Sequence, residues 1–111
     1  MSLSKTDILA VAATLFHDQS YHGTTMRQIA HACEVTGAGL YAHITSKEEI
    51  LWEIVNRTGH RFLSQARAVP QTLAVTEQLR LLTNGHLAVL AHHPQDVTVF
   101  FNEWRALTPE R

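Results

Sequence analysis

The sequence predicts an all-α fold, with a three-helix helix-turn-helix domain joined by a long fourth helix to a partial second helical domain. Apolar residues recur at helical spacing along the chain, and no stretch alternates as a strand would. Capping pairs, in which Ser or Thr precedes an acidic or Gln residue by three positions, stand before Lys5, Met26 and Lys47. We therefore place the two predicted domains at residues 1–46 and 47–111.

The first predicted helix runs from a cap at Ser4 to about Gln19. Ile8, Ala12 and Phe16 recur on one of its faces, as they would on a helix that covers a core. A short loop with one glycine then leads to the next capping residue.

The second and third predicted helices are short and closely joined. Thr25 caps a helix over about residues 26–33. A turn at residues 34–35 contains no glycine, and Thr36 caps a further helix over about residues 37–43. This is the spacing of a helix-turn-helix.

The third predicted helix is not built for stability alone. It contains two glycines, each of which costs about 1 kcal/mol in a helix interior relative to alanine. Small residues let a backbone approach another surface closely. Leu40 and Ile44 are expected to face inward, whereas Tyr41 and His43 fall on other faces, either as surface contacts or as ordinary packing and surface residues.

A long fourth helix is expected from Lys47 to about Ala66. A cation in the first turn of a helix opposes the helix dipole. Lys47 is therefore explained if an anion such as phosphate binds there, or if it is a solvated surface lysine.

Two further helices are expected after Pro70, over about residues 72–92 and from Pro94 to about Leu107. The former carries an apolar stripe. The aromatic residues of the latter form either an ordinary buried face or the wall of a ligand pocket or partner surface; they are Phe100, Phe101 and Trp104.

Length, composition and charge limit the classes of function. The 111 residues suit one domain or slightly more, and a hydrophobic share of 45% is that of a globular protein. The net charge is −1, so a DNA-binding face would depend on few side chains and helix ends, with moderate salt dependence. One cysteine excludes an internal disulfide and fits a reducing cytosol. We expect neither a secretory leader nor a membrane span.

No catalytic, metal or cofactor site is expected. His92 and His93 are adjacent, so they cannot readily share one helix face with His86 as metal ligands. Cys33 falls on the expected buried face of its helix, where a core role is favoured over nucleophilic chemistry.

The segment around the helix-turn-helix resembles the DNA-binding domain of TetR-family transcriptional repressors. The resemblance covers about residues 5–65, and Gly37 stands where the family commonly has Lys or Arg. The matching residues are Gly23, Thr25, Met26, Arg27, Ile29, Ala30, Val35, Leu40, Tyr41, His43, Ser46, Lys47, Glu48 and Leu51.

The resemblance implies a DNA-binding role for particular residues. The third helix would enter the major groove, with small side chains against base edges. Arg27 would contact a base or a phosphate, and other residues would hold phosphates. The expected DNA-binding residues are Thr25, Arg27, Thr36, Gly37, Ala38, Gly39, Tyr41, His43 and Lys47.

The resemblance also implies a cytoplasmic, ligand-responsive homodimer on double-stranded palindromic DNA, with its reading helices about 34 Å apart. Residues 47–111 would begin the ligand-binding and dimerisation domain without completing it. The stretch from Phe100 to Arg105 is similar to the sixth helix of family members linked to lipid or acyl-CoA metabolism, which makes Phe100, Phe101 and Trp104 candidates for the pocket. The alternative is an all-helical interaction module that pairs through its last two helices and does not bind DNA.

Overall fold

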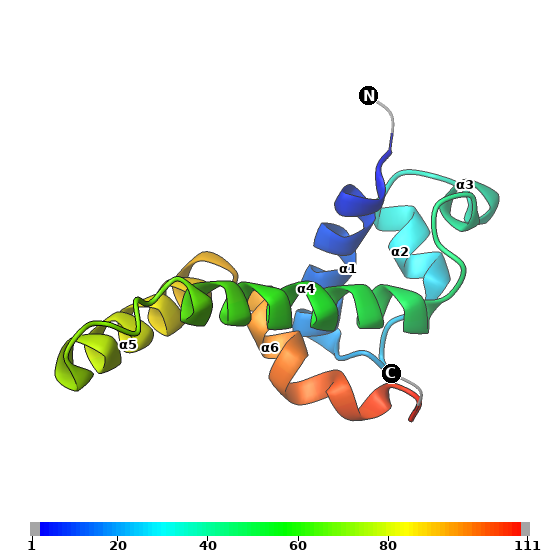
Figure 1. The fold of residues 1–111 in the computed structure, drawn as a ribbon. Helices are drawn as coiled ribbons and strands as arrows, with labels where there is room; N and C mark the ends of the chain where they lie inside the picture. Colours follow the sequence, from blue (N-terminus) through cyan, green and yellow to red (C-terminus); the bar gives the residue numbers. More distant parts are fainter. Residues whose placement is uncertain (1–2, 110–111) are drawn as a thin grey trace.

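The computed structural model describes residues 3–109, and within this range all of its regular secondary structure is helical (Figure 1). The predicted fold class is confirmed. The helices are α1 (Lys5–Gln19), α2 (Met26–Ala32), α3 (Gly37–Tyr41), α4 (Lys47–Arg67), α5 (Val75–His92) and α6 (Pro94–Glu103), followed by the 3-10 helix η1 (Trp104–Ala106).

The first helices begin where their capping residues predict. Ser4 and Thr25 each form a complete capping box with the residue three positions later. At α4 the prediction is half correct, because Ser46 accepts from the Glu49 N–H but the Glu49 carboxylate accepts from Thr45 instead. That carboxylate lies 2.6 Å from the Thr45 nitrogen and 2.5 Å from its hydroxyl oxygen.

Three predicted boundaries differ from the structure. α3 ends at Tyr41, two residues early, and Ile44 is buried although it lies beyond the helix. α5 begins at Val75, not at residue 72, because the Gln78 side chain donates to the carbonyls of residues 71 and 73 and fixes a turn before the helix. α6 is α-helical only to Glu103 and then tightens into η1.

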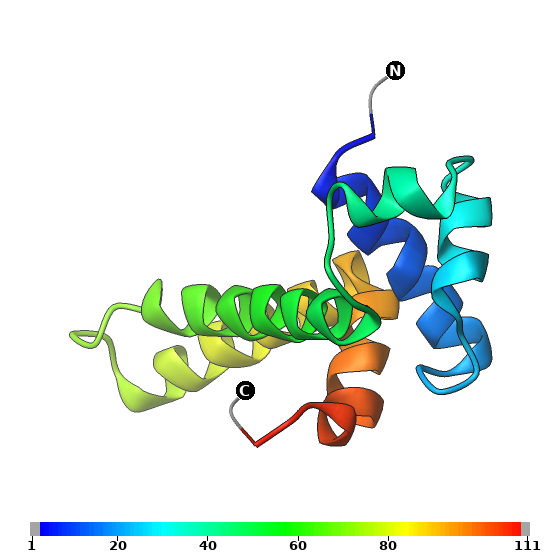
Figure 2. The ribbon, with the colours of Figure 1, turned by 90° about the vertical axis from the view of Figure 1, so that its right-hand side faces the viewer.

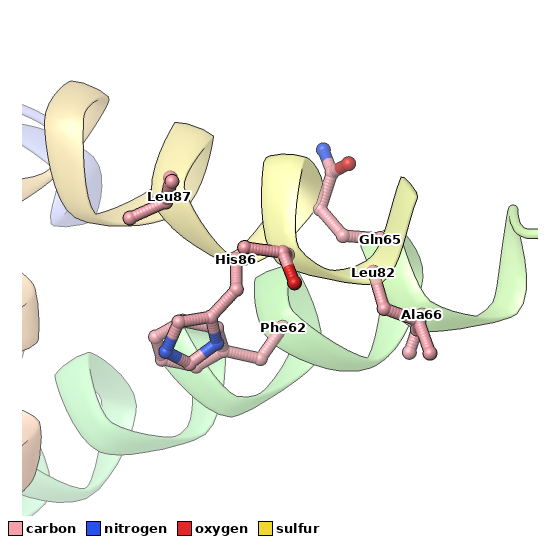
Figure 3. Close-up of a pocket in the computed structure, with 7 residues that line it drawn as sticks. Phe62, Gln65, Ala66, Leu82, His86 and Leu87 are labelled. Carbon is pink, nitrogen blue, oxygen red and sulfur yellow. The ribbon is translucent and has the colours of Figure 1, made fainter. Parts of the chain in front are cut away.

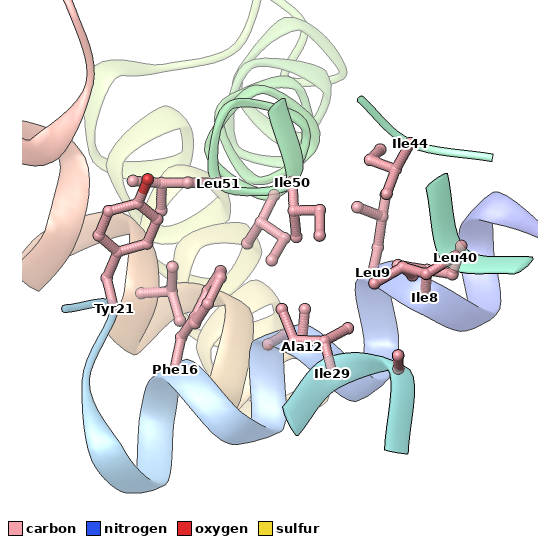
Figure 4. Packing of buried hydrophobic residues seen from close by; sticks show 14 residues of the cluster. Ile8, Leu9, Ala12, Phe16, Tyr21, Ile29, Leu40, Ile44, Ile50 and Leu51 are labelled. Atoms are coloured by element: carbon pink, nitrogen blue, oxygen red, sulfur yellow. The ribbon is translucent and has the colours of Figure 1, made fainter. Parts of the chain in front are cut away.

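A single buried cluster holds the first four helices together (Figure 4). Phe16 of α1 packs edge-on against Tyr21 with ring centroids 5.2 Å apart. Val99 of α6 joins the cluster, so buried packing extends across the predicted division at residues 46 and 47, which stays a prediction. The other members are Ile8, Leu9, Ala12, Ala13, Ile29, Ala30, Leu40, Ile44, Ile50, Leu51 and Ile54.

The molecule has two unlike parts, which we call the head (residues 4–58) and the arm (residues 59–92). In the arm, the second half of α4 and α5 run side by side away from the head (Figures 1 and 2). The arm makes the molecule long, with extents of 54 × 33 × 25 Å and a radius of gyration of 16.4 Å. A compact domain of this length has a radius of gyration of about 13 Å.

The apolar stripe predicted for α5 is present but mostly exposed. Leu79 and Leu87 are 58% and 54% exposed, and Val89 is the buried residue of this helix. None of the helices in the described part combines the length and the apolar character of a membrane span.

A buried ion cluster joins α4 to α6. The Asp96 carboxylate accepts from Nε and a terminal nitrogen of Arg57, at 2.7 and 3.0 Å, and from a terminal nitrogen of Arg61 at 2.6 Å. Asp96 is 6% exposed, so a charge that would be costly to bury alone is paired on both oxygens.

Candidate functional site

The turn between α2 and α3 sets the angle of α3. Glu34 has a φ of 60°, in the left-handed region that favours glycine. The Val35 N–H donates to the Ala30 carbonyl at 3.0 Å, which closes the turn over the end of α2. The sequence therefore makes this turn with a strained residue.

The short helix α3 points one face into the core and the other out. Leu40 and Ile44 are 0% and 1% exposed, and Tyr41 is 53% exposed, so the expected inward and outward faces are confirmed. The Thr36 hydroxyl accepts from the Gly39 N–H at 3.0 Å and caps the helix.

Neither glycine of α3 is required by the fold. A Cβ added at Gly37 would meet nothing within 4 Å, and one added at Gly39 would make ordinary contacts of 3.4 Å or more. Neither residue has a positive φ. The missing side chains instead leave the backbone of α3 open on its outer side.

A depression of about 490 Å³ lies between α2 and α3. It brings together three of the predicted DNA-binding residues, Arg27, Gly37 and Tyr41. His31 also lines it, and sequence reasoning missed this residue, although its place one helical turn after Arg27 was a signal. The arrangement offers a cation, an imidazole and a phenol around exposed backbone.

The remaining predicted DNA-binding residues do not line this depression. Ala38 and His43 are exposed, and the Thr25 hydroxyl is used to cap α2, where it accepts from the Gln28 N–H at 3.1 Å. Direct contact between these residues and DNA stays a prediction.

The contacts of Lys47 contradict one of its two readings, that of a solvated surface lysine, and leave the phosphate contact a prediction. Its Nζ donates to the carbonyls of Tyr21 and Thr24, at 3.0 and 3.1 Å, and lies 4.2 Å from the centroid of the Tyr21 ring. It is therefore not a freely solvated lysine. An ammonium has three N–H donors, so one remains for a phosphate.

The three ligand-pocket candidates do not line one cavity. The rings of Phe100 and Phe101 lie 5.8 and 6.3 Å from that of Phe62. Trp104 lines a separate depression of about 380 Å³ beside Trp52. The alternative of a buried aromatic face is wrong for Phe101 and Trp104, which are 54% and 53% exposed, because α6 buries Val97 and Val99 instead.

A groove of about 350 Å³ between α4 and α5 was not predicted (Figure 3). Two of its lining residues, Phe62 and His86, form a stacked pair with ring centroids 4.7 Å apart and planes at 25°. Leu82 and Leu87 complete the apolar lining. The helical spacing of α5 carried a signal for this groove, but its α4 partner did not follow from the sequence.

Reactive chemistry is not favoured at Cys33. Burial, followed by the negative charge of Asp7, raises the pKa of this thiol above its usual value near 9. A thiol in its neutral form is a poor nucleophile. Among residues 3–109, no three His, Cys, Asp or Glu side chains gather as a metal site would require.

Comparison with known proteins gives one consistent result. The family described as "Bacterial regulatory proteins, tetR family" matches residues 8–54. The transcriptional repressor KstR2 of Mycobacterium tuberculosis is 27% identical over 105 residues, which is 94% of this chain and 52% of KstR2. The chain thus spans about half the length of the curated relatives that it matches along most of its own length.

Solved structures agree with the sequence relatives. The TetR-family regulator PfmR from Thermus thermophilus is 28% identical with a TM-score of 0.87, over 93% of this chain and 57% of PfmR. AibR, solved in complex with isovaleryl coenzyme A and operator DNA, is 35% identical with a TM-score of 0.82, over 96% of this chain and 58% of AibR.

Proposed function

Because the chain belongs to the TetR family of bacterial regulatory proteins, we propose that it is a sequence-specific DNA-binding transcriptional regulator. We further propose that it acts as a repressor, and as a homodimer on a palindromic operator. Such a protein works on chromosomal DNA in the cytoplasm. The relatives with which the chain is compared are regulators, which favours this role over an enzyme and over an interaction module.

The observation that carries the proposal is the bare outer side of α3. The fold does not need either glycine of this short helix, and glycine has a lower helix propensity than alanine, so each glycine is a loss to the helix. Close approach of another backbone explains this loss, as when a helix lies in the major groove. Arg27 and Tyr41 flank the exposed backbone, where they can contact a base edge and a phosphate.

The test is DNA binding by fluorescence anisotropy across a salt series. The probe is DNA that flanks the protein's own coding region, and scrambled DNA of equal length is the comparison. Arg27→Ala should weaken binding by about 1–3 kcal/mol and reduce selectivity if Arg27 reads a base. Arg80→Ala is the matched control, because Arg80 lies on α5 and pairs there with Glu77.

Two results would contradict the proposal. One is equal affinity of the unaltered chain for the flanking and scrambled DNA. The other is an Arg27→Ala variant that binds as tightly as Arg80→Ala.

We propose an effector of the lipid or acyl-CoA class. AibR, which is similar over 96% of this chain, was solved with isovaleryl coenzyme A, and KstR2 is described as a ketosteroid transcriptional regulator. Exposed aromatic side chains at Phe101 and Trp104, and the apolar groove at Phe62, provide apolar surface near α6. Isovaleryl coenzyme A should release the bound DNA, and free coenzyme A should not; equal effects of the two would reject this class.

A further inference from the structure

The loop that joins α1 to α2, residues 20–25, is held by two other helices. The backbone N–H of Tyr21 donates to the Glu103 carboxylate of α6 at 3.1 Å. The carbonyls of Tyr21 and Thr24 accept from Lys47 of α4 at 3.0 and 3.1 Å. α4 and α6 are therefore anchored on the same few atoms of backbone.

The loop leads directly into the start of α2. The Gln19 side chain donates to the Gly23 carbonyl at 3.2 Å and to the Gln28 side-chain oxygen at 2.8 Å. That same oxygen accepts from the Thr25 N–H at 2.9 Å, as one half of the capping box of α2. Arg27, on the candidate DNA face, lies within this first turn, so a shift of the loop shifts its position.

The loop has little freedom to move by itself. Tyr21 is 7% exposed, packs edge-on against Phe16 and lies beneath the Lys47 ammonium. A Cβ on Gly23 would lie 2.1 Å from the Gln19 carbonyl oxygen, which shows how closely the loop folds back on α1. A close-packed segment of this kind moves as a unit with its neighbours and does not deform gradually.

Glu103 lies at the end of α6, among side chains that a ligand or partner could contact. It is the last α-helical residue before η1, and it bonds a backbone group 82 residues away in the chain. Its neighbours Phe101 and Trp104 are more than half exposed. Displacement of this turn would therefore disturb the hydrogen bond between Glu103 and the Tyr21 N–H.

We propose that Glu103 and Lys47 are positioning residues for DNA binding, which couple α6 and α4 to the start of α2 through the loop at residues 20–25. This inference rests on the proposed function. Under this proposal, a movement of α6 changes the position of the DNA face through the contact with Tyr21. It also assigns Lys47 a main role in holding the loop, in place of a phosphate contact.

The deciding experiment compares Glu103→Ala with Glu103→Gln in the DNA-binding assay. Both changes remove a negative charge, so simple electrostatics predicts equal and slightly tighter binding for the two. Glutamine keeps an oxygen that accepts the Tyr21 N–H, and alanine does not. Positioning therefore predicts about fivefold weaker binding for Glu103→Ala alone, the lower end of measured couplings between sites. Equal affinities for the two variants would overturn the proposal.

Amide hydrogen exchange tests the coupling without DNA. The amides of Thr24, Thr25 and Gln28 bond within the loop and cap, not to Glu103. Their exchange should accelerate in Glu103→Ala and stay unchanged in Glu103→Gln and in Glu77→Ala, which removes a carboxylate from the distant α5 (Figure 1). Unchanged exchange in Glu103→Ala would overturn the coupling.

Lys47→Met separates the two roles of Lys47. A lost phosphate contact would reduce the slope of log affinity against log salt by about 1. Positioning predicts weaker binding with the slope retained and faster exchange at Thr24 and Thr25. If the unaltered chain fails to select its DNA, the proposed function fails, whereas the exchange measurements still decide whether the loop is coupled to α6.

Discussion

The head and the arm contain the same kinds of apolar residue, yet only the head buries them. In the head, Leu40 and Ile50 are fully buried in a cluster to which α1, α2, α3 and α4 all contribute. In the arm, Leu63, Leu79 and Leu87 are each about half exposed. Two packed helices can cover only the stripes that face each other, whereas four helices enclose a core. Helical spacing therefore identifies an apolar face, but a further layer of structure decides whether that face is buried.

The largest expected difference between the two parts comes from one substitution made in each. Leu40→Ala should lower the free energy of unfolding by about 3 kcal/mol, because it leaves a cavity in the head. Leu79→Ala should change it by less than about 0.5 kcal/mol, because this side chain is 58% exposed. Urea denaturation followed by circular dichroism measures both. Equal losses would mean that the arm is covered in solution.

The ion cluster tests how far charge holds α6 on α4 where the head meets the arm. Asp96→Ala leaves Arg57 and Arg61 partly buried without their shared carboxylate, which should cost about 3 kcal/mol. Asp96→Asn keeps one acceptor and should lose less. Amide exchange of α6 should accelerate in the alanine variant, and a loss confined to the amides of α1 would contradict this assignment.

Much of the head could be predicted because its signals are local. Ser4 and Thr25 cap their helices with partners three residues away, and the spacing of Leu40 and Ile44 fixes their inward faces. The carbonyl contacts of Lys47 could not be predicted, because they are not local. Its carbonyl partners lie 26 and 23 residues away in the chain, and they meet it only once the fold has formed.

The face of α6 could not be predicted for the same reason. Its most prominent apolar residues are aromatic, yet Val97 and Val99 are the ones buried, because α1 and α4 select the side of α6 against which they pack. Asp96 received no role from the sequence, since its partners Arg57 and Arg61 lie 39 and 35 residues away. The three candidate pocket residues therefore shared a predicted helix but do not share a cavity.

A smaller effect is expected within the head, at the turn between α2 and α3. Glu34 adopts a φ of 60°, where a residue with a Cβ costs about 1 kcal/mol relative to glycine. Glu34→Gly should raise the free energy of unfolding by about this amount. Glu34→Ala removes the same carboxylate and keeps the Cβ, so it should not stabilise. Stabilisation by both variants would attribute the effect to charge and not to backbone strain.

The smallest effect compares one carboxylate from each part. Hydrogen bonds from Thr45, with a lesser contribution from Lys5, hold the pKa of Glu49 in the head below its usual value near 4.5. The hydrogen bond from Arg80 does the same for the pKa of the exposed Glu77 in the arm. As the pH falls, each of these carboxylates therefore takes up a proton in the unfolded chain before it does so in the folded chain. The stability that each group contributes is present above about pH 4.5 and is lost as the pH falls through the lower, folded-state pKa.

Added salt should weaken the stabilising effect of Glu77 much more than that of Glu49. Exposed ion pairs are screened, whereas hydrogen bonds from a neighbouring hydroxyl and N–H are not. Urea midpoints measured from pH 7 to pH 3 should show a shallower acid decline in Glu49→Gln, and this difference should persist at about 1 M salt, where the Debye length is only about 3 Å. The corresponding difference for Glu77→Gln should vanish there. If salt removed both differences equally, the carboxylate in the head would be no better protected from solvent than the one in the arm, and the contrast between the two parts would be limited to their apolar residues.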